Sequence, residues 1–128
     1  MITGVGVDMV STRRIARWLS LPGLPERYFH RDELAASLAK GAGAAASLAG
    51  RFAAKEAFGK ALGTGLAGIA LKDIMVVNDG NGKPEIAVAG TAKTALGRSG
   101  AGRVHLSVAH EKEFAVAVVV LEKTQEEK

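Results

Sequence analysis

A long alanine-rich segment constrains the fold more than any other part of the chain. The glycines of Gly63-Thr64-Gly65 end this segment, so the sequence predicts a long central helix over residues 44–62. At 3.6 residues per turn, Phe52, Glu56 and Lys60 share one stripe of that helix, flanked closely by alanines. Glu56 is therefore predicted to lie among small apolar neighbours.

A carboxylate in such a place needs a cationic partner, because withdrawing it from water costs several kcal/mol when it is left unpaired. Two interpretations of Glu56 are open. Lys60 follows at i+4, where an ordinary salt bridge would contribute about 0.2–0.5 kcal/mol. Alternatively, Glu56 binds a metal ion or takes part in catalysis.

The composition predicts one soluble domain with an anionic partner. The chain has 128 residues and no cysteine; we expect a single domain over 1–122 and a charged, frayed tail over 123–128. No signal peptide or apolar run long enough to span a membrane is visible, which predicts a cytoplasmic protein. The net charge is +4, but aromatic residues make up only 5% of the chain and the basic residues are dispersed, so nucleic acid is the weakest candidate partner.

The first strand is predicted over residues 2–9, with Gly4, Gly6 and Asp8 on one face. A face made of glycine can be approached closely by a helix or a ligand. Asp8, at the end of the strand, is either a helix cap or a functional carboxylate. Ser11 and Thr12 stand nearer the next helix and would cap it better.

A short amphipathic helix is predicted over residues 12–19, with Ile15, Trp18 and Leu19 facing inward. Its opposite side carries Arg13, Arg14 and Arg17. These arginines form either a docking face for an acidic partner or an ordinary solvated surface.

The remaining elements follow from local signals. An interruption between helices is expected at residues 21–25. Gly63 to Gly68 spells G-x-G-x-x-G, but here the motif closes a helix, whereas a dinucleotide-binding motif opens one, so a dinucleotide-binding fold is rejected. The last strand is the most apolar and should be central. The expected elements are a helix over 31–39, a hairpin of strands 73–78 and 84–88, a helix over 91–97, and strands 104–110 and 113–122.

Two histidines lie five residues apart in the strand over 104–110 and should point to opposite faces, which argues against a zinc site. His105 shares a face with Ser107, where they either contact an anionic ligand or form a half-buried polar pair. His110 ends the strand, a suitable place for a base or a ligand contact. Lys83, at the end of the hairpin loop, either contacts an anion or keeps a strand edge soluble.

Several motifs together resemble a known family. They are Gly4-Val5-Gly6-Val7-Asp8, Arg51-Phe52-Ala53-Ala54-Lys55-Glu56-Ala57 followed by Lys60, Gly63-Thr64-Gly65, Gly82-Lys83-Pro84 and His105-Leu106-Ser107-Val108-Ala109-His110. Their order and spacing resemble the holo-acyl-carrier-protein synthases, the short type of 4′-phosphopantetheinyl transferase. The resemblance implies an α+β fold of order β-α-α-α-β-β-α-β-β, with a mainly antiparallel sheet packed on a long central helix. It also implies a homotrimer with active sites between subunits.

The activity implied by the resemblance is Mg²⁺-dependent transfer of 4′-phosphopantetheine from coenzyme A to a serine of apo acyl carrier protein, releasing adenosine 3′,5′-bisphosphate. Asp8 and Glu56 would bind Mg²⁺, and Lys60 would face the pyrophosphate. The proton acceptor would be Glu56, directly or through a metal-bound water, or else His110. Coenzyme A contacts are expected from Arg51, Lys55, Lys60, Gly63, Gly65, Lys83, His105 and Ser107, and carrier-protein docking from Arg13, Arg14 and Arg17. A non-catalytic coenzyme A or nucleotide-binding module of the same fold is the alternative.

Overall fold

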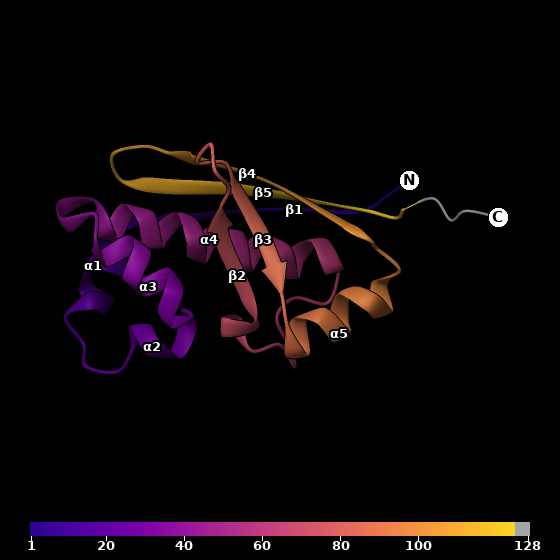
Figure 1. Ribbon diagram of the computed structural model, residues 1–128, viewed down its shortest axis with the longest axis horizontal. Coiled ribbons are helices and arrows are strands. Elements are labelled where there is room, and N and C mark those ends of the chain that lie inside the picture. The colour runs from indigo at the N-terminus through magenta and orange to yellow at the C-terminus, as the bar shows by residue number, and fades with distance from the viewer. Residues whose placement is uncertain (125–128) are drawn as a thin grey trace.

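The computed structural model describes residues 1–124 and contains two antiparallel sheets (Figure 1). The three-stranded sheet has the order β1-β5-β4, and the two-stranded sheet is the hairpin β2-β3. The strands are β1 (Ile2–Ser11), β2 (Ile74–Asn78), β3 (Pro84–Val88), β4 (Arg103–His110) and β5 (Phe114–Glu122). The helices are α1 (Thr12–Leu19), α2 (Pro25–Tyr28), α3 (Arg31–Leu38), α4 (Ala44–Leu62) and α5 (Gly90–Ser99), with short 3₁₀ turns at Gly41–Gly43 and Leu71–Asp73.

The predicted α+β class is confirmed, and so are several bounds. Helices α1 and α4 begin and end where the sequence predicts, and β5 is the central strand. Two details differ. The hairpin forms a separate sheet, and Pro25, expected within a break, instead begins the extra helix α2, because proline suits the first turn of a helix.

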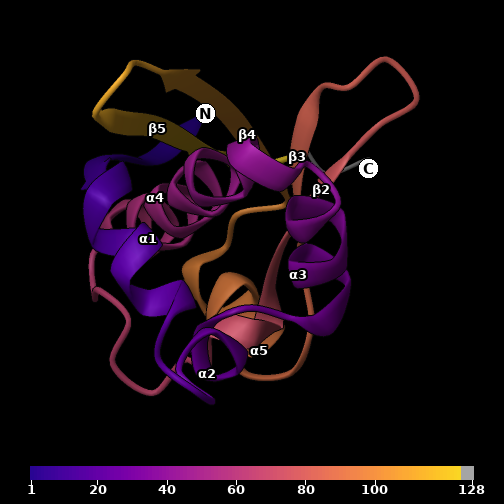
Figure 2. The ribbon, with the colours of Figure 1, turned by 90° about the vertical axis from the view of Figure 1, so that its left-hand side faces the viewer.

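Helix α4 is the centre of the molecule and lies along one face of the three-stranded sheet (Figures 1 and 2). Its small residues allow the helix backbone to lie directly on β1. A Cβ on Gly4 would collide with the backbone of Ala61, and one on Gly6 would collide with the backbone of Ala57. The glycine face of the first strand is therefore a helix-packing face, and it brings the following residue on that face, Asp8, to the side of α4.

The opposite face of the sheet is exposed and apolar. Val5, Val7 and Met9 of β1 alternate with the glycines and are each more than half exposed. Val118 of β5 pairs with Val7, and Phe114 lies at the end of the same strand. This face lies on the side of the sheet away from α4.

The tail prediction is only partly addressed by the structure. The Lys123 N–H donates to the carbonyl of Met1 at 2.8 Å. Residues 125–128 of the expected frayed tail lie outside the described residues.

Candidate active site

Asp8 and Lys60 meet beside the C-terminal half of α4. The Lys60 Nζ donates to Asp8 Oδ1 at 3.0 Å and to the carbonyl of Val7 at 3.1 Å. Lys60 thus pairs with Asp8, and in the part of the chain that the structure describes no ion pair joins it to Glu56. The simple i,i+4 salt bridge is wrong, because β1 offers Lys60 two acceptors at once.

Glu56 lies close enough to Asp8 for the two carboxylates to repel each other. Partial burial raises the pKa of Glu56, and the charge of Asp8 raises it further, while Arg14 and Lys60 offset part of the effect. Like charges brought together in this way favour either protonation or a bound cation. The donor set therefore fits a divalent cation.

Two carboxylates are enough for Mg²⁺, which commonly completes its coordination with water and substrate phosphates. Across residues 1–124, no cluster of three or more His, Cys, Asp or Glu side chains is found. A site at Asp8 and Glu56 would consequently depend on ligands from outside the chain.

The basic helix α1 stands next to these carboxylates. It follows β1 directly, and the Ser11 side chain caps it by accepting from the backbone N–H of Arg14 at 3.3 Å. The Arg14 guanidinium lies over the Trp18 ring, 5.0 Å from its centroid, and 5.6 Å from the centroid of Phe52 on α4. These rings hold Arg14 where its charge acts on Glu56.

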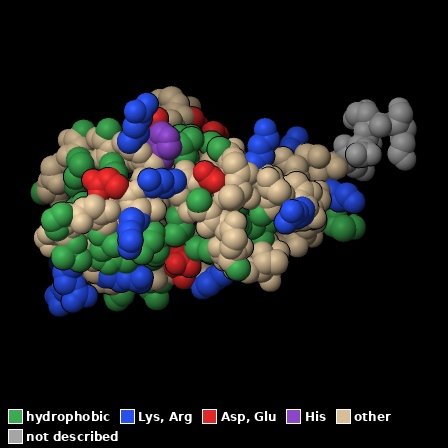
Figure 3. All heavy atoms as spheres, turned by 90° about the horizontal axis from the view of Figure 1, so that it is seen from below, with side chains coloured by type: hydrophobic (Ala, Val, Ile, Leu, Met, Phe, Trp, Pro, Cys, Tyr) green, Lys and Arg blue, Asp and Glu red, His purple; other side chains and the backbone are tan. Residues whose placement is uncertain are grey.

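Figure 3 shows how the charged side chains are distributed over one face of the molecule. Lys and Arg side chains are scattered over this face and interspersed with Asp and Glu. They do not form one continuous basic track there.

A pocket of about 270 Å³ lies on the other flank of α4. Helix α4, strand β4 and the β2-β3 hairpin all contribute to its walls. The residues used below are Arg51, Val76, Asn78, Gly82, Pro84 and His110. Gly50 also lines it, and a Cβ there would lie 2.7 Å from His110 Nε2, so glycine is what allows the imidazole to rest against the helix.

The carboxylates and the pocket lie on opposite sides of α4. Arg51 and Glu56 are five residues apart, which turns their side chains about 140° away from each other. Asp8 lies on β1 and His110 on β4, with β5 between these strands. One chain therefore does not bring His110 beside Glu56, and the two candidate bases belong to different parts of the molecular surface.

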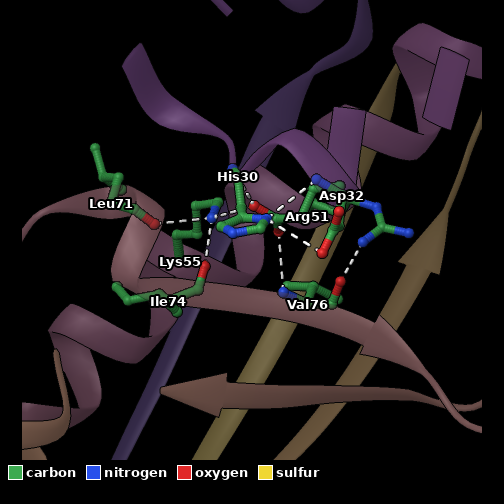
Figure 4. A network of polar contacts seen from close by, with 8 residues as sticks. His30, Asp32, Arg51, Lys55, Leu71, Ile74 and Val76 are labelled. Atoms are coloured by element: carbon green, nitrogen blue, oxygen red, sulfur yellow. Dashed lines mark hydrogen bonds and ion pairs between the residues drawn. The ribbon is translucent and has the colours of Figure 1, made fainter. Parts of the chain in front are cut away.

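Lys55 requires a correction. Its side chain is fully buried, and its Nζ donates to Glu33 Oε1 at 2.8 Å, to the carbonyl of Leu71 at 2.9 Å and to the carbonyl of Ile74 (Figure 4). All three ammonium protons are used within the core. The expected coenzyme A contact is wrong, because no donor of Lys55 is left for a ligand.

Glu33 is the partner that sequence reasoning missed. It lies in the first turn of α3, where an acidic residue looks like an ordinary complement to the helix dipole. The sequence carries one signal, because Glu33 stands three residues after His30, at the spacing of a capping box. In the structure the Glu33 carboxylate accepts the backbone N–H of His30 at 2.9 Å.

The remaining expected contacts lie in three places. Gly63 ends α4 with φ 84° and Gly65 has φ 68°, so both form the turn that follows Lys60. Lys83 is exposed between two pocket residues, and its backbone N–H donates to Asp79 Oδ1 at 2.9 Å. His105 and Ser107 lie on the exposed face of the sheet, away from the pocket, and His105 Nε2 is 2.9 Å from Glu122 Oε1.

Comparisons with known proteins identify the family of this chain. The model of the 4′-phosphopantetheinyl transferase superfamily matches residues 4–119. A holo-[acyl-carrier-protein] synthase of Treponema denticola is 56% identical over 95% of this chain and 99% of its own length. The corresponding protein of Treponema pallidum strain Nichols is 44% identical, over 95% of this chain and 97% of its own.

Solved structures show the same fold. A holo-(acyl-carrier-protein) synthase from Bacillus anthracis in complex with CoA (3′,5′-ADP) superposes with a TM-score of 0.81 at 40% identity, covering 97% of this chain and 99% of that one. The enzyme from Neisseria meningitidis gives a TM-score of 0.85 at 38% identity, covering 96% and 100%. The chain therefore belongs to the holo-[acyl-carrier-protein] synthases of the 4′-phosphopantetheinyl transferase superfamily.

Proposed function

We propose that this enzyme transfers 4′-phosphopantetheine from coenzyme A to a serine of apo acyl carrier protein, with adenosine 3′,5′-bisphosphate as the other product, and that it needs Mg²⁺. The observation that carries the proposal is the meeting of Asp8, Glu56 and Lys60 beside the arginine-bearing helix α1. Coenzyme A as the donor is supported by the related Bacillus anthracis protein, whose structure is described with CoA (3′,5′-ADP).

In the proposed site, Asp8 and Glu56 would hold Mg²⁺, which when bound would neutralise charge on the pyrophosphate. Lys60 is half exposed, so its ammonium reaches a phosphate oxygen and stabilises the departing bisphosphate. Glu56 accepts the proton of the carrier serine, whose oxygen bonds to the phosphorus of the pantetheine phosphate as the bond to the nucleotide phosphate breaks.

Coenzyme A binding is assigned to the pocket on the other flank of α4, with Arg51 and His110 in its wall and Lys83 at its edge. Because that pocket and the carboxylates lie on opposite sides of one helix, the complete site is proposed to form between two copies of the chain. The exposed apolar face of the sheet supports a homotrimer, in which Val5, Val7, Met9, Phe114 and Val118 would be covered.

Two further predictions follow from this assembly. His105 and Ser107 would contact coenzyme A only if a neighbouring copy brings the ligand to their face of the sheet. Gly63 and Gly65 would approach the nucleotide from the turn after Lys60. Both remain predictions.

Carrier-protein docking is assigned to α1. Arg13 and Arg17 are exposed on it, and Arg14 links this helix to Glu56. An acidic carrier protein bound there would present its serine beside the two carboxylates. Electrostatic docking of this kind mainly raises the association rate and fixes the orientation of the two proteins. A cytoplasmic location is proposed with these partners, and no nucleic acid or membrane is assigned; no helix within residues 1–124 is long and apolar enough to cross a bilayer.

Mass spectrometry of apo carrier protein incubated with the enzyme, coenzyme A and Mg²⁺ tests the proposal. We expect one phosphopantetheine adduct, lost with Asp8→Ala and Glu56→Ala while both variants stay folded. Absence of an adduct on every fatty-acid and secondary-pathway carrier tried would refute the activity. Tight binding of coenzyme A without transfer would instead identify a non-catalytic binding module.

A further inference from the structure

The outer edge of strand β2 is held by charged side chains from two helices instead of by another strand. In an antiparallel pair, alternate residues turn both of their peptide groups away from the partner strand, and Val76, which lies opposite Ile86 of β3, does so. Its N–H donates to Glu33 Oε2 at 2.9 Å, and its carbonyl accepts from Arg51. The outward peptide groups of β2 thus attach the hairpin to α3 and α4 at Val76, and Lys55 of α4 also donates to the carbonyl of Ile74.

Glu33 is the residue on which this attachment converges. It is 2% exposed, and its two oxygens accept from Lys55, from Val76 and from the backbone N–H of His30. It is the carboxylate of a buried group that also contains two cations, Lys55 and Arg51. Glu33 stabilises the charge of Lys55 through a direct ion pair and the charge of Arg51 through electrostatic attraction without contact.

Arg51 belongs both to this buried group and to the pocket wall. Its bond to the Val76 carbonyl ties the guanidinium to β2, and the rest of the hairpin's contribution to the pocket is Asn78, Gly82 and Pro84. Moving β2 away from α4 would therefore shift the Arg51 guanidinium and one whole wall of the pocket together. Glu33 helps to hold β2 in place through its bond to the Val76 N–H, beside the direct bonds that Arg51 and Lys55 of α4 make to the strand, and it does not itself line the pocket.

We propose that Glu33 is a positioning residue for coenzyme A: its buried carboxylate holds Val76 and, through it, Arg51 in the geometry that binds the ligand. This inference rests on the proposed function, because it takes the pocket to be the coenzyme A site. It assigns Glu33 no contact with substrate.

The test is a double-mutant cycle of Glu33→Gln and Arg51→Gln, read as kcat and KM for both substrates. Glu33→Gln keeps the shape but removes the charge, and its amide offers one oxygen acceptor in place of two, so the N–H groups of His30 and Val76 cannot both keep their partner. We expect its KM for coenzyme A to rise about tenfold, in the range of coupled neighbours, while kcat and the KM for carrier protein stay near wild type. Because Glu33 acts through Arg51, adding Glu33→Gln to Arg51→Gln should raise that KM little further. If Glu33→Gln instead caused a general structural defect, its effect on the KM for coenzyme A would add in full to that of Arg51→Gln.

Glu85→Gln is the matched control, since Glu85 is an exposed residue of the same hairpin. It should leave both KM values unchanged. Should Glu33→Gln fail to fold, the double variant Glu33→Gln/Lys55→Gln removes the ion pair as a neutral unit, and the cycle is run from that background.

The outcomes separate cleanly. A wild-type KM for coenzyme A in folded Glu33→Gln, or full additivity with Arg51→Gln, overturns the positioning role and leaves the transferase proposal standing. If both Glu33 variants are unfolded, Glu33 is structural only and the inference is wrong. If wild-type enzyme binds coenzyme A but transfers nothing, the proposed function fails and the cycle is read on the Kd instead. No binding of coenzyme A overturns both.

Discussion

Gly6→Ala tests the claim that the glycine face of β1 exists to seat α4. The added Cβ would lie 2.7 Å from the backbone nitrogen of Ala61 and 3.0 Å from the carbonyl carbon of Ala57, and it would collide with the Ala57 oxygen. Ordinary van der Waals contact begins at 3.4 Å, so strand and helix would have to separate by at least about 0.7 Å along the nitrogen contact. No side chain can rotate to relieve these contacts, because all of them are with backbone atoms.

Overpacking of this kind typically costs about 1–3 kcal/mol, and we expect the upper end here. For a chain of 128 residues, that corresponds to a fall in Tm of about 10 °C. The same separation would lengthen the 3.0 Å bond between Lys60 and Asp8, so activity should fall in molecules that remain folded.

Urea unfolding followed by the fluorescence of Trp18, the single tryptophan, measures the loss at one fixed protein concentration. Gly80→Ala is the matched control. Its Cβ would meet nothing within 4 Å and its φ is not in the left-handed region, so its stability should change by less than about 0.5 kcal/mol. If Gly6→Ala unfolds at the same urea concentration as Gly80→Ala, the close seating of β1 on α4 is refuted.

Four further predictions concern charge and assembly. Glu56→Gln should abolish transfer and yet stabilise the metal-free fold at neutral pH, because it removes a partly buried charge that Asp8 repels. Since burial and Asp8 raise the folded pKa of Glu56, the stability of the metal-free wild type should fall as pH rises from 4.5 through that pKa, and calorimetry of the variant should lack this fall. Lys55→Met should destabilise the protein by about 3–5 kcal/mol in urea unfolding, because it leaves the Glu33 carboxylate buried and unpaired; a neutral result would contradict the buried pair. Arg14→Glu should raise the KM for carrier protein far more than the KM for coenzyme A, whereas Arg98→Glu on the distant α5 should change neither; equal effects of Arg14→Glu on both substrates would argue against docking. If the proposed trimer forms through the exposed apolar face, Val7→Asp should shift the protein from trimer to monomer in analytical ultracentrifugation, and an unchanged mass would remove the proposed interface.

Local signals in the sequence determined the elements and many of their bounds. The glycines at 63 and 65 end α4, Ser11 caps α1, and the Asn- and Gly-rich loop at 78–82 joins β2 to β3. The alternation of Gly4, Gly6 and Asp8 in β1 assigned one face to close packing, because side chains in a strand alternate strictly. These signals act over a few residues, so they can be read without knowing the fold.

Only the tertiary structure decided which charges meet. Lys60 has Glu56 within reach on its own helix, but its long side chain turns to Asp8 and Val7 of β1. Lys55 belongs to the same motif as Glu56 and yet points into the core, where it donates to the carboxylate of Glu33 on α3. Strand parity shows that Asp8 and His110 can both face α4, but not that β5 and the helix itself separate them. Long, flexible side chains choose partners from elements far apart in sequence, and that choice is made by packing and desolvation, which no local pattern records.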